Sequence, residues 1–361
     1  MRERRLKRLR AEMAIADLEA LVIAAPEQLS HANVLYLSGF TGSAAHLLVT
    51  AAHAWLVTDF RYLEQAAREA PHFELVRQRS SVGETLAQLV RDAGIRQVGF
   101  EDDKVPVSMH RAWEGAMPGV LFQPATGLIE RLRLIKDAGE VEAIRRAALL
   151  SGRALEDLLT RGIRGMTERA LAVELECAMR RLGLDGVGFP TIVGSGPRGS
   201  EPHAHPSERV MQDGELVTVD FGGLMHGYRS DETVTVALGT VPSKLREVFD
   251  IVHEAQAAGR AAVKPGALDR DMHRACRRVI EAAGYGDYFG HGSGHGVGLD
   301  VHEPPFSARE PDYVLEPGMT ITVEPGIYLP GVGGVRLEDT LVVTESGHER
   351  LTTLSKDWRV L

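Results

Sequence analysis

The sequence predicts two domains: an α/β domain at the amino terminus, followed by an α+β domain with internal pseudo-twofold symmetry. Strand-like and helix-like patterns alternate from residue 15 to about residue 125, which is typical of an α/β domain. Farther on, two segments share one frame, Gly214-Glu-Leu-Val-Thr-Val-Asp220 and Gly318-Met-Thr-Ile-Thr-Val-Glu324. Upstream of each, glycines bracket helical patterns of equal length, residues 165–183 and 266–284. This repetition indicates a duplicated helix-and-hairpin unit.

The composition is that of an ordinary soluble protein. Of 361 residues, 44% are hydrophobic and 25% are charged. The 41 basic and 50 acidic residues give a net charge of −9, which argues against a nucleic-acid partner. No apolar run approaches the roughly 18 residues of a membrane span, so we expect no membrane association.

The first domain is expected to carry no chemistry of its own. Residues 2–13 have leucines and a methionine at helical spacing on a basic helix. The expected strands are residues 18–24, 45–49, 54–58, 73–76, 97–100 and 120–122. The expected helices are residues 63–70, 84–93 and 106–117. Since these residues contain no phosphate-binding loop and no cluster of metal ligands, catalysis is assigned to the second domain.

The domain boundary is expected near residues 126–136, which gives a first domain of residues 1–130 and a second of residues 131–361. A charged segment with few glycines or prolines, residues 128–159, predicts the helix that opens the second domain. Cys177 and Cys276 are too few for a disulfide framework, and both lie in helical patterns. We therefore expect two buried thiols in a cytoplasmic protein.

The two hairpin segments bring carboxylates together. If the first hairpin turns near Met225 and His226, then Asp220 and Asp231 lie roughly opposite each other, where like charges are destabilising. One hairpin alone is compatible with solvated aspartates. The second hairpin repeats the pattern with Glu324 and Glu338, and four carboxylates around one axis cannot all stay ionised without cations. The sequence therefore predicts a metal site.

Histidines precede both hairpins. His203 lies in a loop before the first hairpin, within Glu-Pro-His-Ala-His-Pro. His291, His295 and His302 lie before the second, in a run of alternating glycines that would let backbone approach a ligand. A single histidine is usually a structural residue, but three within twelve positions favour a functional role.

These residues carry a family resemblance. The second domain resembles the pita-bread metallopeptidases, specifically the proline-specific branch that holds aminopeptidase P and prolidase. Asn-Val-Leu-Tyr-Leu-Ser-Gly-Phe-Thr-Gly-Ser at residues 33–43 and Thr-Asp-Phe-Arg-Tyr at residues 58–62 resemble a creatinase-type amino-terminal domain. The resemblance implies a pita-bread fold for the second domain. It also implies five metal ligands: Asp220, Asp231, His295, Glu324 and Glu338.

In the family pattern Asp231 and Glu338 bridge two ions, Asp220 completes one, and His295 with Glu324 completes the other. Such an oxygen-rich site suits Mn²⁺, with Co²⁺ or Zn²⁺ as alternatives. Two ions can activate water and polarise a scissile carbonyl group.

The remaining site residues receive catalytic roles. Glu324 is expected to accept a proton from the attacking water, and His302 and His291 to donate to the carbonyl oxygen or the leaving nitrogen. The resemblance implies that His203 and Arg336 meet the substrate. Arg336 could instead be a hydrogen-bonding partner of Glu338, since the two are two residues apart on one strand face.

The resulting expectation is a dinuclear metal-dependent exopeptidase that hydrolyses the Xaa-Pro bond of short peptides, as a dipeptidase or an aminopeptidase. A homodimer is expected by analogy with the family. A proline imide nitrogen has no hydrogen, so a site that fits it needs no acceptor there. The alternatives are an exopeptidase without strict proline specificity, a non-catalytic peptide-binding homologue, and a metal-free amidine hydrolase. The intact ligand set disfavours the last two.

Overall fold

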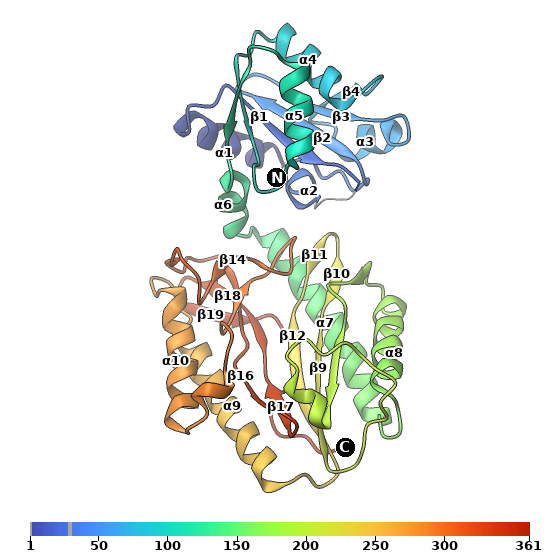
Figure 1. Ribbon diagram of the computed structural model, residues 1–361, viewed down its shortest axis with the longest axis vertical. Helices are drawn as coiled ribbons and strands as arrows, with labels where there is room; N and C mark the ends of the chain where they lie inside the picture. Colours follow the sequence, from blue (N-terminus) through green and yellow to red (C-terminus); the bar gives the residue numbers. More distant parts are fainter. Residues whose placement is uncertain (1, 28–30) are drawn as a thin grey trace. The chain divides into compact units, whose positions relative to one another are not determined.

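A computed structural model describes residues 2–27 and 31–361 (Figure 1). The chain forms two compact units, Met1–Arg133 and Leu134–Leu361. Within the described residues, no helix has both the length and the apolar character needed to cross a membrane.

The first unit contains a six-stranded mixed sheet in the order β4-β3-β2-β1-β5-β6. β1 and β2 pair antiparallel, as do β2 and β3, whereas the β3–β4, β1–β5 and β5–β6 pairs are parallel. All six predicted strands are present, with ends within two residues of those expected. They are β1 (Ala20–Ala25), β2 (Ala45–Thr50), β3 (Ala54–Thr58), β4 (Glu74–Arg77), β5 (Gln97–Phe100) and β6 (Leu121–Pro124).

Helices pack on this sheet as the alternation predicts. Trp113 and Leu86 are fully buried against sheet residues such as Val22 and Val98. The predicted amino-terminal helix is confirmed, because its leucines and methionine at helical spacing are buried. The helices are α1 (Arg2–Ile15), α2 (Ala32–Ser38), α3 (Leu63–Glu69), α4 (Val82–Asp92), α5 (Val107–Ala116) and α6 (Leu128–Leu134).

The prediction of one continuous helix over residues 128–159 was wrong. The structure has α6 and a separate helix α7 (Ala138–Arg161). The break occurs because Asp137 caps α7: its side chain accepts hydrogen bonds from the backbone N–H groups of Gly139 and Glu140 at 3.0 Å. Glu140 in turn accepts from the backbone N–H of Asp137, which completes a capping box.

The second unit places small sheets between pairs of helices (Figure 1). Its further helices are α8 (Glu168–Arg181), α9 (Ser243–Ala262), α10 (Asp269–Ala282) and the 3₁₀ turns η1 (Gly196–Ser200) and η2 (Gly286–Tyr288). Its first strands are β7 (Gly186–Val187), β8 (Ile192–Ser195), β9 (Glu215–Phe221), β10 (Gly223–Met225), β11 (Tyr228–Arg229) and β12 (Glu232–Leu238). The later strands are β13 (His295–Gly296), β14 (Glu303–Phe306), β15 (Thr320–Val323), β16 (Gly326–Leu329), β17 (Gly333–Arg336), β18 (Asp339–Thr344) and β19 (Gly347–Arg350).

The predicted internal repeat is confirmed. α8 and α10 have 14 residues each, and each lies between the glycines that bracket it in the sequence. The residue before each helix makes an equivalent antiparallel bridge, Thr167 with Val210 and Leu268 with Val314. Each half has its own apolar core, one where α7 and α8 meet β9 and β12, the other where α9 and α10 meet β15 and β18.

The cysteine prediction was half right. Cys276 is fully buried in the second core, but Cys177 is exposed, and neither forms a disulfide. Cys177 lies between the buried positions Leu175 and Met179 of α8, so its side chain falls on the solvent side of an amphipathic helix.

Candidate metal centre

The first hairpin carries Asp220 within β9 and Asp231 just before β12. Asp220 pairs with Thr233, not with Asp231 as the sequence suggested. The turn is centred one residue later than expected, because His226 and Gly227 form the two-residue loop between β10 and β11. Both have positive φ, 52° and 87°, as this kind of hairpin loop requires. Because of this one-residue shift, Asp231 lies just outside the paired residues of β9 and β12.

The second hairpin carries its acids at the end of the β15–β18 ladder. Val323 pairs with Asp339, the last pair of that ladder. Glu324 directly follows β15 and Glu338 directly precedes β18. Both acids therefore leave the ladder at the same end, as the repeated frame predicts.

Hydrogen bonds join the two hairpins. The Thr233 hydroxyl donates to Glu338 Oε2 at 2.7 Å, and the Glu338 N–H donates to the Thr233 carbonyl at 3.1 Å. The Thr340 hydroxyl donates to the Asp231 carbonyl at 2.7 Å. The halves thereby bring the acids of both hairpins to one place.

His295 joins these acids from β13. Its Nε2 lies 3.7 Å from Asp231 Oδ2 and 3.4 Å from Glu324 Oε1. Its Nδ1 lies 3.1 Å from the Gly296 carbonyl oxygen, which can only accept, so Nδ1 carries the proton. The Nε2 lone pair therefore faces the carboxylates. Ligand atoms of Asp231, His295 and Glu338 all lie within 4.8 Å of one another.

The electrostatics of this cluster favour a cation. Burial first, and then the neighbouring carboxylates, raise the pKa of Asp231 and Glu338 well above the ordinary range. Burial raises the pKa of Glu324 to about 8 and lowers that of His295 to about 4. Oδ1 of Asp220 is buried and has no hydrogen-bond donor among the described residues. The donor set, mostly oxygen with one neutral imidazole, fits hard divalent ions.

Arg336 contacts Asp220 directly, and it is linked to Glu338 through the hydroxyl group of Thr233. Its Nη2 donates to Asp220 Oδ2 at 2.6 Å. Its Nη1 lies 3.0 Å from both the Tyr328 hydroxyl and the Pro202 carbonyl, and its Nε lies 3.3 Å from the Thr233 hydroxyl. The side chain is nearly fully buried. This geometry suits a residue that orients Asp220 better than one that binds a substrate carboxylate.

The other predicted histidines lie around this cluster. His302 is exposed, and its ring centroid lies 4.4 Å from that of His295. His291 is half-buried: its Nδ1 lies 2.7 Å from the Gly292 carbonyl and its Nε2 lies 2.9 Å from the Tyr328 hydroxyl. Burial is the main cause that lowers the pKa of both rings, and the charge of Arg336 lowers the pKa of His291 further. His203 is exposed.

The glycines of the histidine run serve chain packing more than ligand approach. A Cβ on Gly294 would collide with the Thr322 carbonyl oxygen, and one on Gly296 with the Pro304 carbonyl oxygen. Gly290, in contrast, faces open space. The alternation of glycines therefore lets β13 lie close to its neighbours, which positions His295.

Three supporting residues were missed by sequence reasoning: Tyr328, Thr233 and Thr340 in the role of hydrogen-bond partners. In the sequence, Thr233 and Thr340 each follow an acid of the repeated pattern by two residues. Tyr328 pairs with Gly334 across the β16–β17 hairpin. Gly334 is two residues before Arg336, so strand alternation puts Tyr328 and Arg336 on the same face, and this was the only sequence signal that could have placed Tyr328.

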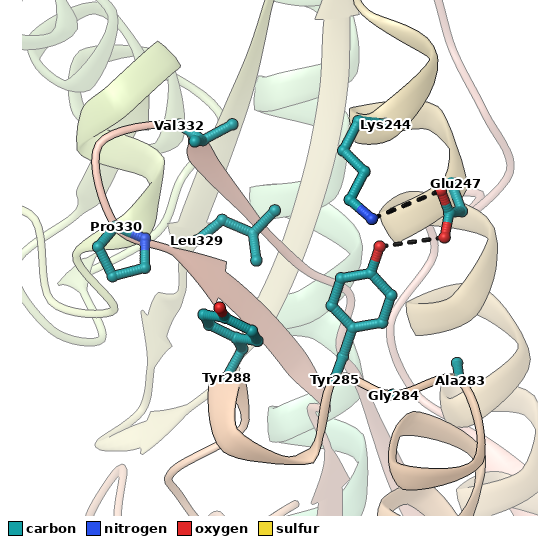
Figure 2. Close-up of a pocket in the computed structure, with 9 residues that line it drawn as sticks. All are labelled: Lys244, Glu247, Ala283, Gly284, Tyr285, Tyr288, Leu329, Pro330 and Val332. Carbon is teal, nitrogen blue, oxygen red and sulfur yellow. Dashed lines mark hydrogen bonds and ion pairs between the residues drawn. The ribbon is translucent and has the colours of Figure 1, made fainter.

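A separate pocket of about 450 Å³ lies between the start of α9, the segment after α10 and the β16–β17 turn (Figure 2). Its polar groups satisfy one another. The Tyr285 hydroxyl donates to Glu247 Oε1 at 3.0 Å, and Lys244 Nζ lies 3.7 Å from Glu247 Oε2. None of the residues that line it is a predicted site residue.

The comparison with protein families decides the identity of the fold. Residues 142–345 match metallopeptidase family M24, and residues 5–135 match the creatinase/prolidase N-terminal domain. The chain belongs to metallopeptidase family M24. Membership in M24 confirms the resemblance and the pita-bread fold, and it implies a divalent metal and a peptide substrate.

Similar proteins span nearly all of this M24 chain. The uncharacterized peptidase YqhT of Bacillus subtilis is 41% identical over 332 residues, which are 92% of this chain and 94% of that protein. The solved Xaa-Pro dipeptidase from Bacillus anthracis has a TM-score of 0.96 at 39% identity and covers 100% of both chains. The X-Pro aminopeptidase from Thermotoga maritima MSB8 has a TM-score of 0.90 at 35% identity, with 97% of this chain and 100% of that one covered.

Proposed function

We propose that this protein is a dinuclear metal-dependent exopeptidase that hydrolyses the Xaa-Pro bond of short peptides. The observation that carries the proposal is the buried cluster in which the His295 Nε2 lone pair faces Asp231 and Glu324. Proline specificity is supported by the similar solved structures, named as an Xaa-Pro dipeptidase and an X-Pro aminopeptidase.

Five residues would hold the metal. Asp231 and Glu338, which have the buried central positions, would contact both ions. Asp220 would complete one position, and His295 with Glu324 the other. Four carboxylates and one imidazole favour Mn²⁺, with Co²⁺ and Zn²⁺ as alternatives. When bound, two divalent ions supply Lewis acidity that activates water and polarises a carbonyl group.

The chain's own groups would orient the reactants and move protons. Glu324 would accept a proton from water on a carboxylate oxygen. Without metal, burial raises its pKa to about 8, so it would be available as a base when bound cations displace its own proton. His302 is exposed beside His295 and can donate from a ring nitrogen to the leaving imide nitrogen. His291 is a poorer donor, because its Nδ1 proton is held by the Gly292 carbonyl.

The other two residues support the substrate and the ligands. Arg336 would hold Asp220 in position. His203 is exposed on the loop before β9, and the family resemblance implies that it contacts the substrate.

Two further proposals concern the oligomeric state of the protein and its location in the cell. We infer a homodimer, in which the chain's first unit, expected to lack chemistry of its own, would serve association. We also infer a cytoplasmic location, which the exposed thiol of Cys177 supports because such thiols persist in reducing compartments.

The substrate test compares Xaa-Pro with Xaa-Ala, as dipeptides and as tripeptides, at saturating Mn²⁺. We expect higher kcat/KM for the proline peptides. Equal or better values for the alanine peptides would contradict proline specificity and favour an exopeptidase of broader specificity. Cleavage of the dipeptide alone would identify a dipeptidase, whereas cleavage of the tripeptide would identify an aminopeptidase. No cleavage by the metal-loaded protein would favour a non-catalytic peptide-binding homologue.

A further inference from the structure

A second acid follows each of the two central acids of the metal centre. Glu232 follows Asp231 at the start of β12, and Asp339 follows Glu338 at the start of β18. Side chains alternate between the faces of a strand, so these second acids point away from the metal-facing side. Both are fully buried. Each half of the repeat therefore carries one buried carboxylate directly behind its metal-facing acid.

One cation contacts both of these carboxylates. Lys356, from the segment after β19, has its Nζ 2.5 Å from Glu232 Oε1 and 3.4 Å from Asp339 Oδ1. The same ammonium group donates to the Leu354 carbonyl at 3.2 Å. An ammonium group has three donors, and these contacts use them all. The side chain is almost completely buried.

Other groups around the two acids contact one half of the repeat each. The Leu354 N–H donates to Glu232 Oε1 at 3.0 Å. Asp339 accepts from the Thr352 hydroxyl at 2.7 Å and from Gln256 Nε2 at 2.8 Å. Two guanidinium groups, those of Arg260 and Arg350, also lie near Asp339, at 3.3 and 3.8 Å. Among these groups, Lys356 is the one that contacts both acids, whereas the hydrogen bonds of Thr233 and Thr340 join the same two strands on the metal-facing side.

We propose that Lys356 is a positioning residue that sets the spacing of Asp231 and Glu338 by holding their neighbours Glu232 and Asp339. The proposal rests on the proposed metal centre. Its physical basis is that the buried ammonium group contacts one carboxylate on each strand and so ties the two strand starts together at a fixed distance. Asp231 and Glu338 directly precede Glu232 and Asp339 in the chain. If the first residues of β12 and β18 moved apart, the distance between the ligands Asp231 and Glu338 would therefore change. Outer groups that orient metal ligands typically change metal affinity by about 10–100-fold.

The test compares Lys356→Met with Arg350→Met. Methionine keeps an unbranched side chain of similar length and removes the charge. Arg350 is a matched control, because its guanidinium contacts Asp339 and does not reach Glu232. Chelator-stripped proteins are titrated with Mn²⁺, and bound ions per chain are measured by equilibrium dialysis with elemental analysis. We expect two ions at near wild-type affinity for Arg350→Met, and about 10–100-fold weaker binding of at least one ion for Lys356→Met.

Two further readouts separate positioning from general stability. The electron paramagnetic resonance spectrum of a Mn²⁺ pair reports the spin coupling between the ions, so at saturating Mn²⁺ we expect altered coupling in Lys356→Met. The double variant Glu232→Gln/Lys356→Met removes both buried charges, while Asp339 keeps Arg260, Gln256 and Thr352. We expect it to regain thermal stability relative to Lys356→Met and to keep the weakened Mn²⁺ binding.

The double variant is also the test if Lys356→Met does not fold. Wild-type Mn²⁺ affinity, stoichiometry and spin coupling in either variant would overturn the positioning role and leave the metal centre intact. A wild-type protein that binds no Mn²⁺ would overturn the metal centre, and this role with it.

Discussion

The Thr233 hydroxyl donates a 2.7 Å hydrogen bond to Glu338, across 105 residues of sequence. Thr340 makes the reciprocal contact, from the second half to the backbone of Asp231. Each acid at the centre of the site is thus oriented by a threonine from the opposite half of the repeat. The ligand geometry is therefore a property of the two halves together.

The first prediction concerns the central ligands. Asp231→Asn and Glu338→Gln should lose bound metal, because each removes an anionic oxygen that is proposed to contact both ions. Elemental analysis after dialysis measures this directly. Glu345→Gln, an exposed carboxylate of the same unit, is the control and should keep full occupancy. Full metal occupancy with wild-type activity in the first two variants would contradict the ligand assignment.

The second prediction concerns His302. His302→Ala should keep its metal and lose about 10²–10⁴ in kcat, the usual contribution of a general acid or base. The ring lies beside His295 and is outside the proposed ligand set. Metal analysis and steady-state kinetics on one preparation separate the two effects. A loss smaller than about threefold would mean that His302 only packs against His295.

The third prediction concerns pH. In the metal-free protein burial raises the pKa of Glu324 to about 8, so the folded chain holds a proton that the unfolded chain releases above about pH 4.5. The stabilisation from that proton is lost as the pH rises towards 8. His291 and His295, with pKa values lowered to about 4, act in the opposite direction, but only below their unfolded value of 6.5. We therefore expect the Tm of chelated protein to fall between about pH 6.5 and pH 8.5.

Calorimetry with and without Mn²⁺ tests this pH dependence. With metal the trend should reverse, because ions bind deprotonated ligands more tightly as the pH rises. Glu101 of the first unit, with a pKa raised by burial to about 7, acts in the same direction as Glu324. Asp231 and Glu338, whose pKa values burial also raises, act in this direction too. Glu324→Gln identifies the part that comes from Glu324, since its chelated form should show a shallower fall. A level or rising Tm in chelated wild-type protein would contradict the prediction.

The fourth prediction concerns chain packing near His295. Gly294→Ala should destabilise the protein by about 1–3 kcal/mol, because its Cβ would press on the Thr322 carbonyl. It should also weaken metal binding, since the His295 N–H donates to the Thr322 hydroxyl at 3.1 Å. Gly290→Ala is the matched control in the same glycine run, with open space around the new methyl group. Equal Tm values for the two variants would contradict this explanation of the glycines.

The fifth prediction concerns assembly. Light scattering at micromolar concentration should give twice the 39.3 kDa mass of one chain. Closed twofold assembly is the commonest form of association among soluble homo-oligomers. A mass of one chain under those conditions would remove the homodimer from the proposal.

Much of the fold could be predicted because its signals are local. α8 and α10 are marked by glycines at both ends, and the strands of the first unit by runs of alternating or apolar residues. The break before α7 was missed, although Asp137 and Glu140 have the spacing of a capping box. The hairpin register was missed because it depends on whether His226 adopts positive φ, which a histidine does only when its surroundings require it.

The sequence predicted which residues form the cluster, but it did not predict the contacts that hold them in place. The repeated hairpins were enough to bring four acids together. The partner of Arg336 was not predictable, because Asp220 lies 116 residues away and on another sheet. Lys356 gave no signal either, since it sits in a segment without regular secondary structure. Such contacts follow from packing, which residue spacing does not encode.

The two apolar cores of the second unit have a consequence for unfolding. The second core also contains Leu216 of β9 and Ala237 of β12, and Ile144 of α7 packs against Val342 of β18, so apolar packing crosses the seam between the halves and should make them unfold together. Ions that bind only when both halves are in place would stabilise that seam by mass action. Metal loading should then raise the Tm of one cooperative transition of the whole second unit.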